Sequence, residues 1–338
     1  MNSKLKQILQ YRLSLLAGLL LFWWVFKDLS IAEIWQAIKN ADYSWILITY
    51  VLTMIAHYIR AYRWNLLLKQ TGNTVSNGEA YLALLAGYGA NLAVPRMGEI
   101  MRCTILRTRQ KVSFDTSLGT VVAERLFDFI CLIFLLCVLI VWQYDILFEY
   151  IQGILSSFIN KKLSALELLF WFLGIVAIGA LLFFFIRQKI NNYLNQSQHP
   201  VVIKAKDFIK GVRVGFFSVL DLQNKWAFIA STAAIWILYY FMAYLIFFSL
   251  PATISLSPGA GLAILVMGAI GIAAPVQGGI GAYHWTVSQT LLLYGISETD
   301  GKVFAALAHA SQFVLTIAFS LVSFGIILLI KPKNHDIN

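Results

Sequence analysis

The sequence predicts an all-α polytopic membrane protein made of one integral membrane domain over residues 1–338. Three observations support this fold class: the chain is 59% hydrophobic and only 12% charged, its mean hydropathy is +0.74, and its apolar residues gather in long runs. A soluble protein of this length needs far more polar surface. A helix of about 20 apolar residues crosses roughly 30 Å of hydrocarbon, and several runs reach that length.

Six apolar runs are long enough to cross a membrane as helices. The first run follows Lys4, Lys6 and Arg12, an arrangement also found in signal peptides. No small-residue cleavage site comes after it, so we expect this segment to be retained as the first span. The six predicted spans cover residues 13–29, 43–68, 117–142, 166–186, 226–250 and 303–330.

Two further apolar segments, residues 81–94 and 259–274, are shorter, rich in glycine and alanine, and followed by Pro95 and Pro275. Lys and Arg concentrate in the cytoplasmic loops of membrane proteins. If the first segment crossed the membrane, the basic stretch 96–111 would lie opposite the basic end of the second span. We therefore predict two re-entrant hairpins that turn back at their prolines, one from each side of the membrane. Full crossing is the alternative.

Three spans and one hairpin occur twice, which is the pattern of an inverted-topology repeat with halves at about residues 1–155 and 160–338. The hairpin tips share the pattern A-x-P-x-x-G-x-I. Irregular backbone at membrane depth must be buried in protein or line a wet cavity, so two opposed hairpins predict a central polar site. Glycines in the turns permit either unusual backbone angles or only close helix packing. The expected turn residues are Pro95, Gly98, Pro275, Gly278, Gly279 and Gly281.

Polar side chains around the first hairpin tip form the strongest local candidate for a headgroup site. Guanidinium groups bind phosphate through two parallel hydrogen bonds, which suits an anionic headgroup. The end of a half-helix adds a partial charge of its own. The cluster comprises Asn91, Arg96, Glu99 and Arg102.

Charged residues inside two of the predicted spans are further candidates. Glu124, Arg125 and Asp128 are spaced three and four residues apart, which places them near one helix face. A lone charge at the centre of a membrane helix costs at least about 2.5 to 3.5 kcal/mol, so we expect these residues to face the interior and pair. They form either a structural network or, through Arg125, part of the headgroup site. Arg60 and Arg63 either bind phosphate or extend to the lipid headgroups.

The second hairpin tip supplies Gln277 and His284 but no carboxylate, and the last span carries His309 and Gln312. His284, His309 and Gln312 are a candidate polar relay that responds to protons. The alternative is that each histidine is simply a hydrogen-bonded interior residue.

Several functional classes are disfavoured. The three cysteines are scattered without C-x-x-C spacing, and no H-E-x-x-H pattern occurs, so we expect no metal site and no cofactor. The net charge of +10 follows from basic loops on one side of the membrane rather than from nucleic-acid binding. No nucleotide-binding loop or serine elbow is present, so we do not expect an enzyme.

Four motifs, in this order along about residues 43–313, resemble the lysylphosphatidylglycerol synthase transmembrane-region family, also called the flippase-like domain family. The resemblance implies kinship with the membrane portion of the multiple peptide resistance factor, which moves aminoacylated phosphatidylglycerol between leaflets, and with archaeal proteins linked to dolichol-phosphate sugars. The motifs are Arg60-x-x-Arg63-Trp64, Asn91-Leu-Ala-Val-Pro95-Arg-Met-Gly98-Glu99-x-x-Arg102, Glu124-Arg125-Leu-x-Asp128 and Pro275-x-x-Gly278-Gly279-Ile-Gly281.

The chain departs from the family pattern in two respects. No segment resembles the soluble aminoacyl-transferase domain of the synthases, so we do not expect lipid aminoacylation. His284 stands where a carboxylate is expected, which leaves the coupling ion open.

The residues and the resemblance together favour a lipid flippase or scramblase. We expect it to move an anionic phospholipid or a polyprenyl-phosphate-linked headgroup across the cytoplasmic (inner) membrane, with both termini in the cytoplasm. Its expected partners are membrane lipids and enzymes of envelope synthesis. The alternatives are a membrane-embedded transferase or hydrolase that uses Glu124 or Asp128 as general base, and an accessory or scaffold protein of envelope lipid or glycan synthesis.

Overall fold

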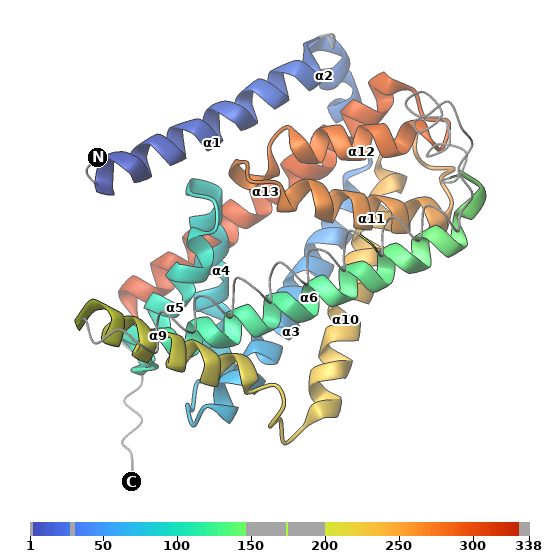
Figure 1. Ribbon diagram of the computed structural model, residues 1–338. Helices are drawn as coiled ribbons and strands as arrows, with labels where there is room; N and C mark the ends of the chain where they lie inside the picture. Colours follow the sequence, from blue (N-terminus) through green and yellow to red (C-terminus); the bar gives the residue numbers. More distant parts are fainter. Residues whose placement is uncertain (1–2, 28–30, 147–173, 175–199, 331–338) are drawn as a thin grey trace. The chain divides into compact units, whose positions relative to one another are not determined.

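The computed structural model describes residues 3–27, 31–146, 174 and 200–330 (Figure 1). The chain divides into two compact units. The larger comprises Met1–Leu139 and Val212–Asn338, and it contains every residue of the candidate site. The smaller unit, Ile140–Gly211, is described only in part. The predicted span at residues 166–186 lies outside the described residues, apart from Gly174.

All regular secondary structure in the described residues is helical, which confirms the predicted fold class. Four helices are long and apolar enough to cross a membrane, and each matches a predicted span. They are α3 (Tyr43–Gln70), α6 (Phe114–Trp142), α10 (Lys225–Leu245) with its 3-10 extension η1 (Ile246–Ser249), and α13 (Glu298–Leu329). The first predicted span lies largely in α1 (Ser3–Phe26), whose apolar part is shorter. The number of six spans therefore stays a prediction.

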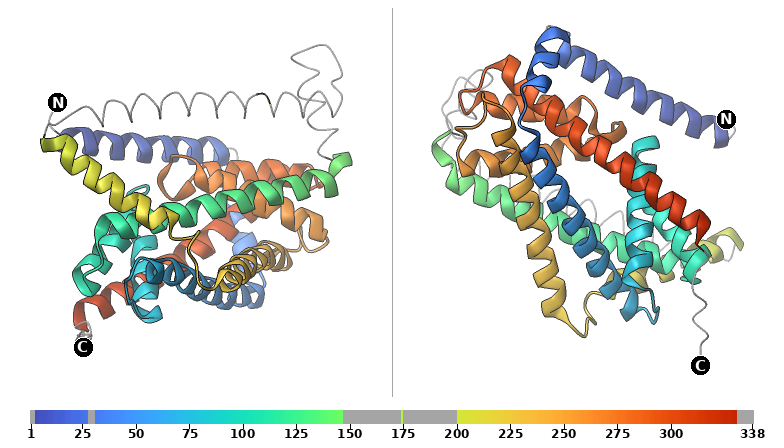
Figure 2. Two further views of the ribbon diagram at one scale, coloured as in Figure 1. Left: turned by 60° about the horizontal axis from the view of Figure 1, so that its bottom comes forward. Right: turned by 180° about the vertical axis from the view of Figure 1, so that it is seen from behind.

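The first of the shorter apolar segments forms one leg of a helical hairpin. Helix α4 (Asn77–Ala93) packs against α5 (Met97–Gln110), and the two are joined by a turn at Pro95 (Figure 2). The legs cross where Gly87 meets Gly98, since a Cβ on Gly87 would lie only 2.8 Å from the Gly98 carbonyl oxygen. Gly98 is therefore needed for close packing rather than for a turn conformation.

A second hairpin pairs α11 (Pro258–Ala273) with α12 (Ala282–Leu292). The connecting segment contains the short 3-10 helix η2 (Gln277–Gly279). Gly278, Gly279 and Gly281 have φ angles of 59°, 75° and 81°, which L side chains rarely adopt. These glycines therefore give the second turn a backbone path that a run of larger residues would resist.

Two hydrophobic clusters hold the hairpins in place. One is formed by α3, α4, α5 and α6 around Trp64 and Leu84. The other joins η1, α11, α12 and α13 around Phe247 and Phe304. The remaining described helices are α2 (Ile31–Lys39) and α9 (Pro200–Phe217).

Arg109 joins three helix ends at the base of the first hairpin. Its guanidinium forms two 2.8 Å hydrogen bonds with the carboxylate of Glu79, and these raise the pKa of Arg109. Its Nη1 also donates to the carbonyl oxygens of Ile327 and Ile330, at 2.9 and 2.8 Å. The side chain thus caps the C-terminal end of α13 while it holds the start of α4.

Candidate functional site

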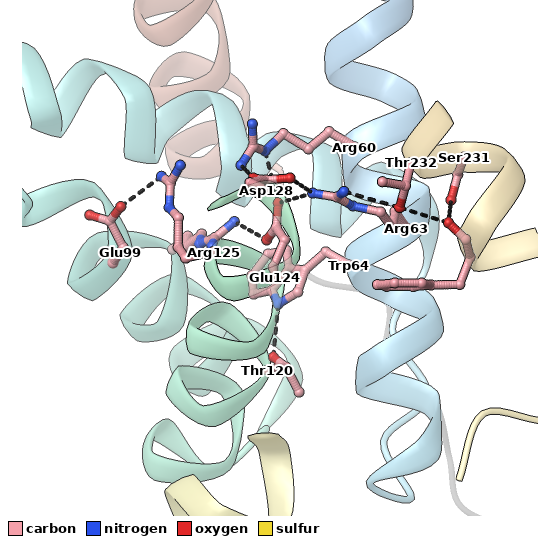
Figure 3. A network of polar contacts seen from close by, with 12 residues as sticks. Arg60, Arg63, Trp64, Glu99, Thr120, Glu124, Arg125, Asp128, Ser231 and Thr232 are labelled. Atoms are coloured by element: carbon pink, nitrogen blue, oxygen red, sulfur yellow. Dashed lines mark hydrogen bonds and ion pairs between the residues drawn. The ribbon is translucent and has the colours of Figure 1, made fainter. Parts of the chain in front are cut away.

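The main feature of the interior is an arginine–carboxylate cluster drawn from three helices. Its members are Arg60 and Arg63 of α3, Arg102 of α5, and Glu124 and Asp128 of α6. Figure 3 shows the α3 and α6 members facing one another. The sequence singled out all five residues, and the structure places them in a single site.

The carboxylates lie between the guanidinium groups. Glu124 Oε1 accepts from Arg60 Nε at 2.8 Å and from Arg63 Nη2 at 3.2 Å, while Glu124 Oε2 lies 2.9 Å from Arg102 Nη1. Asp128 accepts from Arg60 Nη2 at 2.5 Å and from Arg63 Nη2 at 2.7 Å. Glu124 therefore contacts all three arginines and is the centre of the cluster.

The cluster is shielded from solvent and carries excess positive charge. The side chains of Arg63 and Glu124 are 0% exposed, and those of Arg102, Arg60 and Asp128 are 3%, 7% and 16% exposed. Three arginines against two carboxylates leave a net charge of +1. A buried ionic group of this kind is stable only when its charges are paired and its polar atoms are hydrogen-bonded.

Helical spacing explains why these residues meet. Arg60, Arg63 and Trp64 lie three and four residues apart on α3, so they share one face, and Glu124 and Asp128 do so on α6. Glu124 is ten residues after the start of α6, about 15 Å along the helix axis. The cluster is thus well inside the helical bundle rather than at a helix end.

Arg102 has the largest unused hydrogen-bonding capacity in the cluster. Its guanidinium lies over the indole ring of Trp64, 4.6 Å from the ring centroid, and Trp64 is fixed by a 2.9 Å hydrogen bond to Thr120. Its Nη1 faces Glu124, whereas its Nε and Nη2 are buried and have no hydrogen-bond partner among the described residues. Nε and Nη2 form one edge of the guanidinium plane, which matches two oxygens of a phosphate or carboxylate.

We expected all the polar residues of the first hairpin tip to bind ligand, but the structure gives them different surroundings. Asn91 Oδ1 accepts a 2.6 Å hydrogen bond from the Gly98 backbone N–H, so this side chain caps α5. Arg96 is exposed and has a φ of 62°, unusual for a residue other than glycine. Arg96 is therefore available at the surface of the tip, whereas the Asn91 oxygen is already engaged.

Arg125 does not join the buried network with Glu124 and Asp128, as the sequence had suggested. Its Nη2 pairs instead with Glu99 Oε1 at 2.7 Å, and its side chain is 44% exposed. Adjacent residues of an α-helix point about 100° apart, so Arg125 cannot share the face of Glu124. The Arg125–Glu99 pair lies on the more exposed side of α6 and joins α6 to α5.

The second hairpin tip is bound to the first. Gln277 Nε2 donates to the carbonyl oxygens of Leu92 and Ala93, at 2.8 and 2.6 Å. These are carbonyls of the last turn of α4, which have no partner within that helix. One side chain of the second hairpin therefore caps the first.

The two histidines of the candidate relay support the second turn. His284 Nδ1 accepts from the Gly281 N–H at 3.2 Å, and His309 Nε2 lies 2.9 Å from the Gly278 carbonyl oxygen. Their ring centroids are 4.7 Å apart. Gln312 lies apart from this pair and contacts Thr53 at 3.4 Å. The structure brings the histidines together but gives Gln312 a different neighbour.

Two polar residues of α10 complete the cluster and were not selected from the sequence. Tyr239 accepts a 3.0 Å hydrogen bond from Arg60 Nη1, and Thr232 accepts one of 3.2 Å from Arg63 Nη1. They are seven residues apart and so lie on one face of a mostly apolar helix. This seven-residue spacing is the sequence feature that could have identified Thr232 and Tyr239 as members of the site.

The chemistry that this arrangement supports is oxyanion binding. The described residues contain no group of three or more His, Cys, Asp or Glu side chains placed to hold a metal ion. The cluster offers a fixed guanidinium edge, excess positive charge and low solvent exposure, a combination that strengthens electrostatic contacts with an anion.

Comparisons with known proteins agree with the family resemblance. The chain matches the family described as Lysylphosphatidylglycerol synthase TM region over residues 11–320. It is 24% identical over 302 residues to a UPF0104 membrane protein of Methanothermobacter thermautotrophicus, and the alignment covers 87% of this chain and 86% of that protein. No solved structure matches the chain.

Proposed function

This chain belongs to the lysylphosphatidylglycerol synthase TM region family of membrane proteins, and from that premise we propose that it carries an anionic lipid headgroup across the membrane. The cargo would be a phospholipid or a polyprenyl-phosphate-linked lipid. We propose a flippase or scramblase rather than an enzyme, in the cytoplasmic membrane with both termini inside.

The observation that carries the proposal is the buried edge of Arg102. Nε and Nη2 have no hydrogen-bond partner among the described residues, in a cluster whose net charge is +1. An unpaired buried donor costs about 1 to 3 kcal/mol, and more when charged, so a purely structural network gains nothing from it. A lipid phosphate would fill both donors and remove the excess charge.

The hairpins suggest how the headgroup would reach this edge. Arg102 is on α5, the return leg of the first hairpin, and its only ion-pair partner among the described residues is Glu124 of α6. In the described conformation the edge is closed to solvent, so access requires α5 and α6 to move relative to one another. That is the behaviour of a carrier with alternating access. The exposed Arg96 and the Arg125–Glu99 pair would receive the headgroup before it enters.

In this proposal the two hairpins are re-entrant and come from opposite sides of the membrane. The contact of Gln277 with the end of α4 supports it, because it joins the two tips inside the described bundle. Inverted repeats of this kind place substrate where broken helices meet. Enzymes of envelope synthesis are proposed partners that would supply or use the lipid.

Lipid translocation in reconstituted vesicles tests the function. A fluorescent phospholipid in the inner leaflet is protected from a membrane-impermeant quencher until it is moved outward. Arg102→Lys keeps the charge but loses the planar fork, so we expect translocation to fall at least about tenfold, which corresponds to 1.4 kcal/mol.

Arg107→Lys is the matched control, because Arg107 is an exposed arginine of the same helix. We expect its rate to stay within about twofold of the wild type, since surface substitutions have small effects. Equal rates for Arg102→Lys and wild type, or no translocation of any lipid by the wild type, would refute the proposal.

A further inference from the structure

The charge and geometry of the arginine–carboxylate cluster indicate which kind of phosphate it would accept. We propose that it selects lipids whose phosphate carries a single negative charge, the phosphodiesters, over phosphomonoester lipids with two. This inference rests on the proposed function, because it assumes that the cluster is the headgroup site. It adds a substrate class and names Asp128 as the residue that sets it.

The charge of the cluster is the first argument. Three arginines and two carboxylates leave +1, so one negative charge brings the described site to neutrality. A dianion would leave a buried excess of −1, and an uncompensated buried charge is strongly unfavourable. The Born penalty for desolvating an ion rises with the square of its charge, whereas its attraction to a fixed +1 rises only in proportion. The second charge of a phosphomonoester therefore adds more penalty than attraction.

The hydrogen-bonding geometry is the second argument. The free edge of Arg102 presents two donors, Nε and Nη2, in a fixed plane. A phosphodiester has two non-ester oxygens, and both can accept from this edge at once. A phosphomonoester has three, so one charged oxygen would be buried beyond the reach of the fork. Among the described residues, the other buried guanidinium donor without a hydrogen-bond partner is Arg63 Nε, and a single donor cannot form a second fork.

Asp128 is the residue that sets the balance. It binds Arg60 and Arg63, and its side chain is 16% exposed, whereas that of the other carboxylate, Glu124, is 0% exposed. Asp128→Asn keeps the shape of the side chain and raises the net charge of the cluster to +2. With that charge a dianion, rather than a monoanion, would neutralise the site.

Binding of short-chain lipids to the purified full-length protein in uncharged detergent tests the inference. The probes are dihexanoyl phosphatidylglycerol, a phosphodiester, and dihexanoyl phosphatidate, a phosphomonoester, measured by titration calorimetry. At pH 8 we expect wild-type protein to bind phosphatidylglycerol at least about tenfold more tightly, a difference of 1.4 kcal/mol. The second proton of a phosphomonoester has a pKa of about 6. At pH 5 phosphatidate becomes a monoanion, so the preference should fall to about twofold or less.

The variants supply the decisive comparison at pH 8. We expect Asp128→Asn to abolish or reverse the preference, while the control Asp221→Asn, which removes the same charge from an exposed position outside the cluster, keeps it. The pH comparison uses only wild-type protein, so it decides the matter even if Asp128→Asn fails to fold. Equal affinities for the two lipids at pH 8 in the wild type would overturn the inference, as would the same shift in both variants.

The vesicle assay separates this inference from the proposed function. Selective binding without translocation would support the charge selection and refute the transporter. Translocation of phosphatidate as fast as phosphatidylglycerol at pH 8 would keep the transporter and refute the selection.

Discussion

Replacing Glu124, the central carboxylate of the arginine–carboxylate cluster, should lower the free energy of unfolding far more than replacing Glu99, a carboxylate outside the cluster. Glu124 is 0% exposed and forms ion pairs with three arginines at 2.8 to 3.2 Å. Glu124→Gln leaves three buried guanidinium groups facing one carboxylate, that of Asp128. Removing one partner from a buried ion pair costs about 3 to 5 kcal/mol. That corresponds to a fall of roughly 100-fold to several thousand-fold in the ratio of folded to unfolded protein.

Glu99→Gln is the matched control, because Glu99 forms one ion pair with an arginine whose side chain is 44% exposed. Exposed pairs contribute about 0.2 to 1 kcal/mol. The free energy of unfolding of each variant can be measured by titration with a denaturing detergent in mixed micelles. A double variant, Glu124→Gln with Arg102→Met, should recover part of the loss, since residues in one network couple by about 0.5 to 3 kcal/mol. Similar losses for Glu124→Gln and Glu99→Gln would refute this account of the cluster.

Three further predictions concern the hairpins. Gln277→Leu should lower the unfolding free energy by about 1 to 3 kcal/mol, because it removes two hydrogen bonds to the end of α4; no loss in the same detergent titration would contradict this. Gly281→Ala should reduce the yield of folded protein much more than Gly295→Ala: both glycines have positive φ, but only a Cβ at Gly281 would meet other atoms, and equal yields would contradict the steric argument. On a background without native cysteines, cysteines at the exposed positions Thr74 and Arg107 should react with an impermeant thiol reagent from the same side, and labelling from opposite sides would contradict re-entry.

The sequence was sufficient to predict the long helices of the described residues, because apolar length alone decides whether a segment can span a membrane. The sequence did not predict the helices that form the return legs of the hairpins. Helix α5 carries three arginines in fourteen residues and therefore has the composition of a basic loop. It is helical because its apolar face packs on α4 and because Asn91 caps its start, and neither contact is visible in a local pattern.

The sequence predicted which residues belong to the site, but not which of them form ion pairs with one another. Charges within apolar spans had to meet in the interior, and four of them do, together with Arg102 of α5. The sequence assigned Arg125 to the same helix face as Glu124, although adjacent positions diverge by about 100°. The observed partners of Glu124 come from α3 and α5, and these contacts depend on how the helices pack. The free edge of Arg102 is likewise a property of the packed structure, since it is defined by what its neighbours fail to provide.

The cap that Gln277 places on α4 has a consequence for biogenesis. It joins residues that are 184 and 185 positions apart in the chain, so the last carbonyls of α4 are synthesised long before their partner. Until Gln277 has been synthesised, these carbonyls at the end of α4 lack the partner that they have in the folded protein. In the proposed re-entrant topology this tip lies at membrane depth, where unpaired backbone groups are unstable, so its carbonyls need water, lipid headgroups or the insertion machinery as partners in the meantime. The first hairpin of a nascent chain stalled before Gln277 should therefore be sensitive to proteases. Once the second hairpin is complete, this sensitivity should be lost.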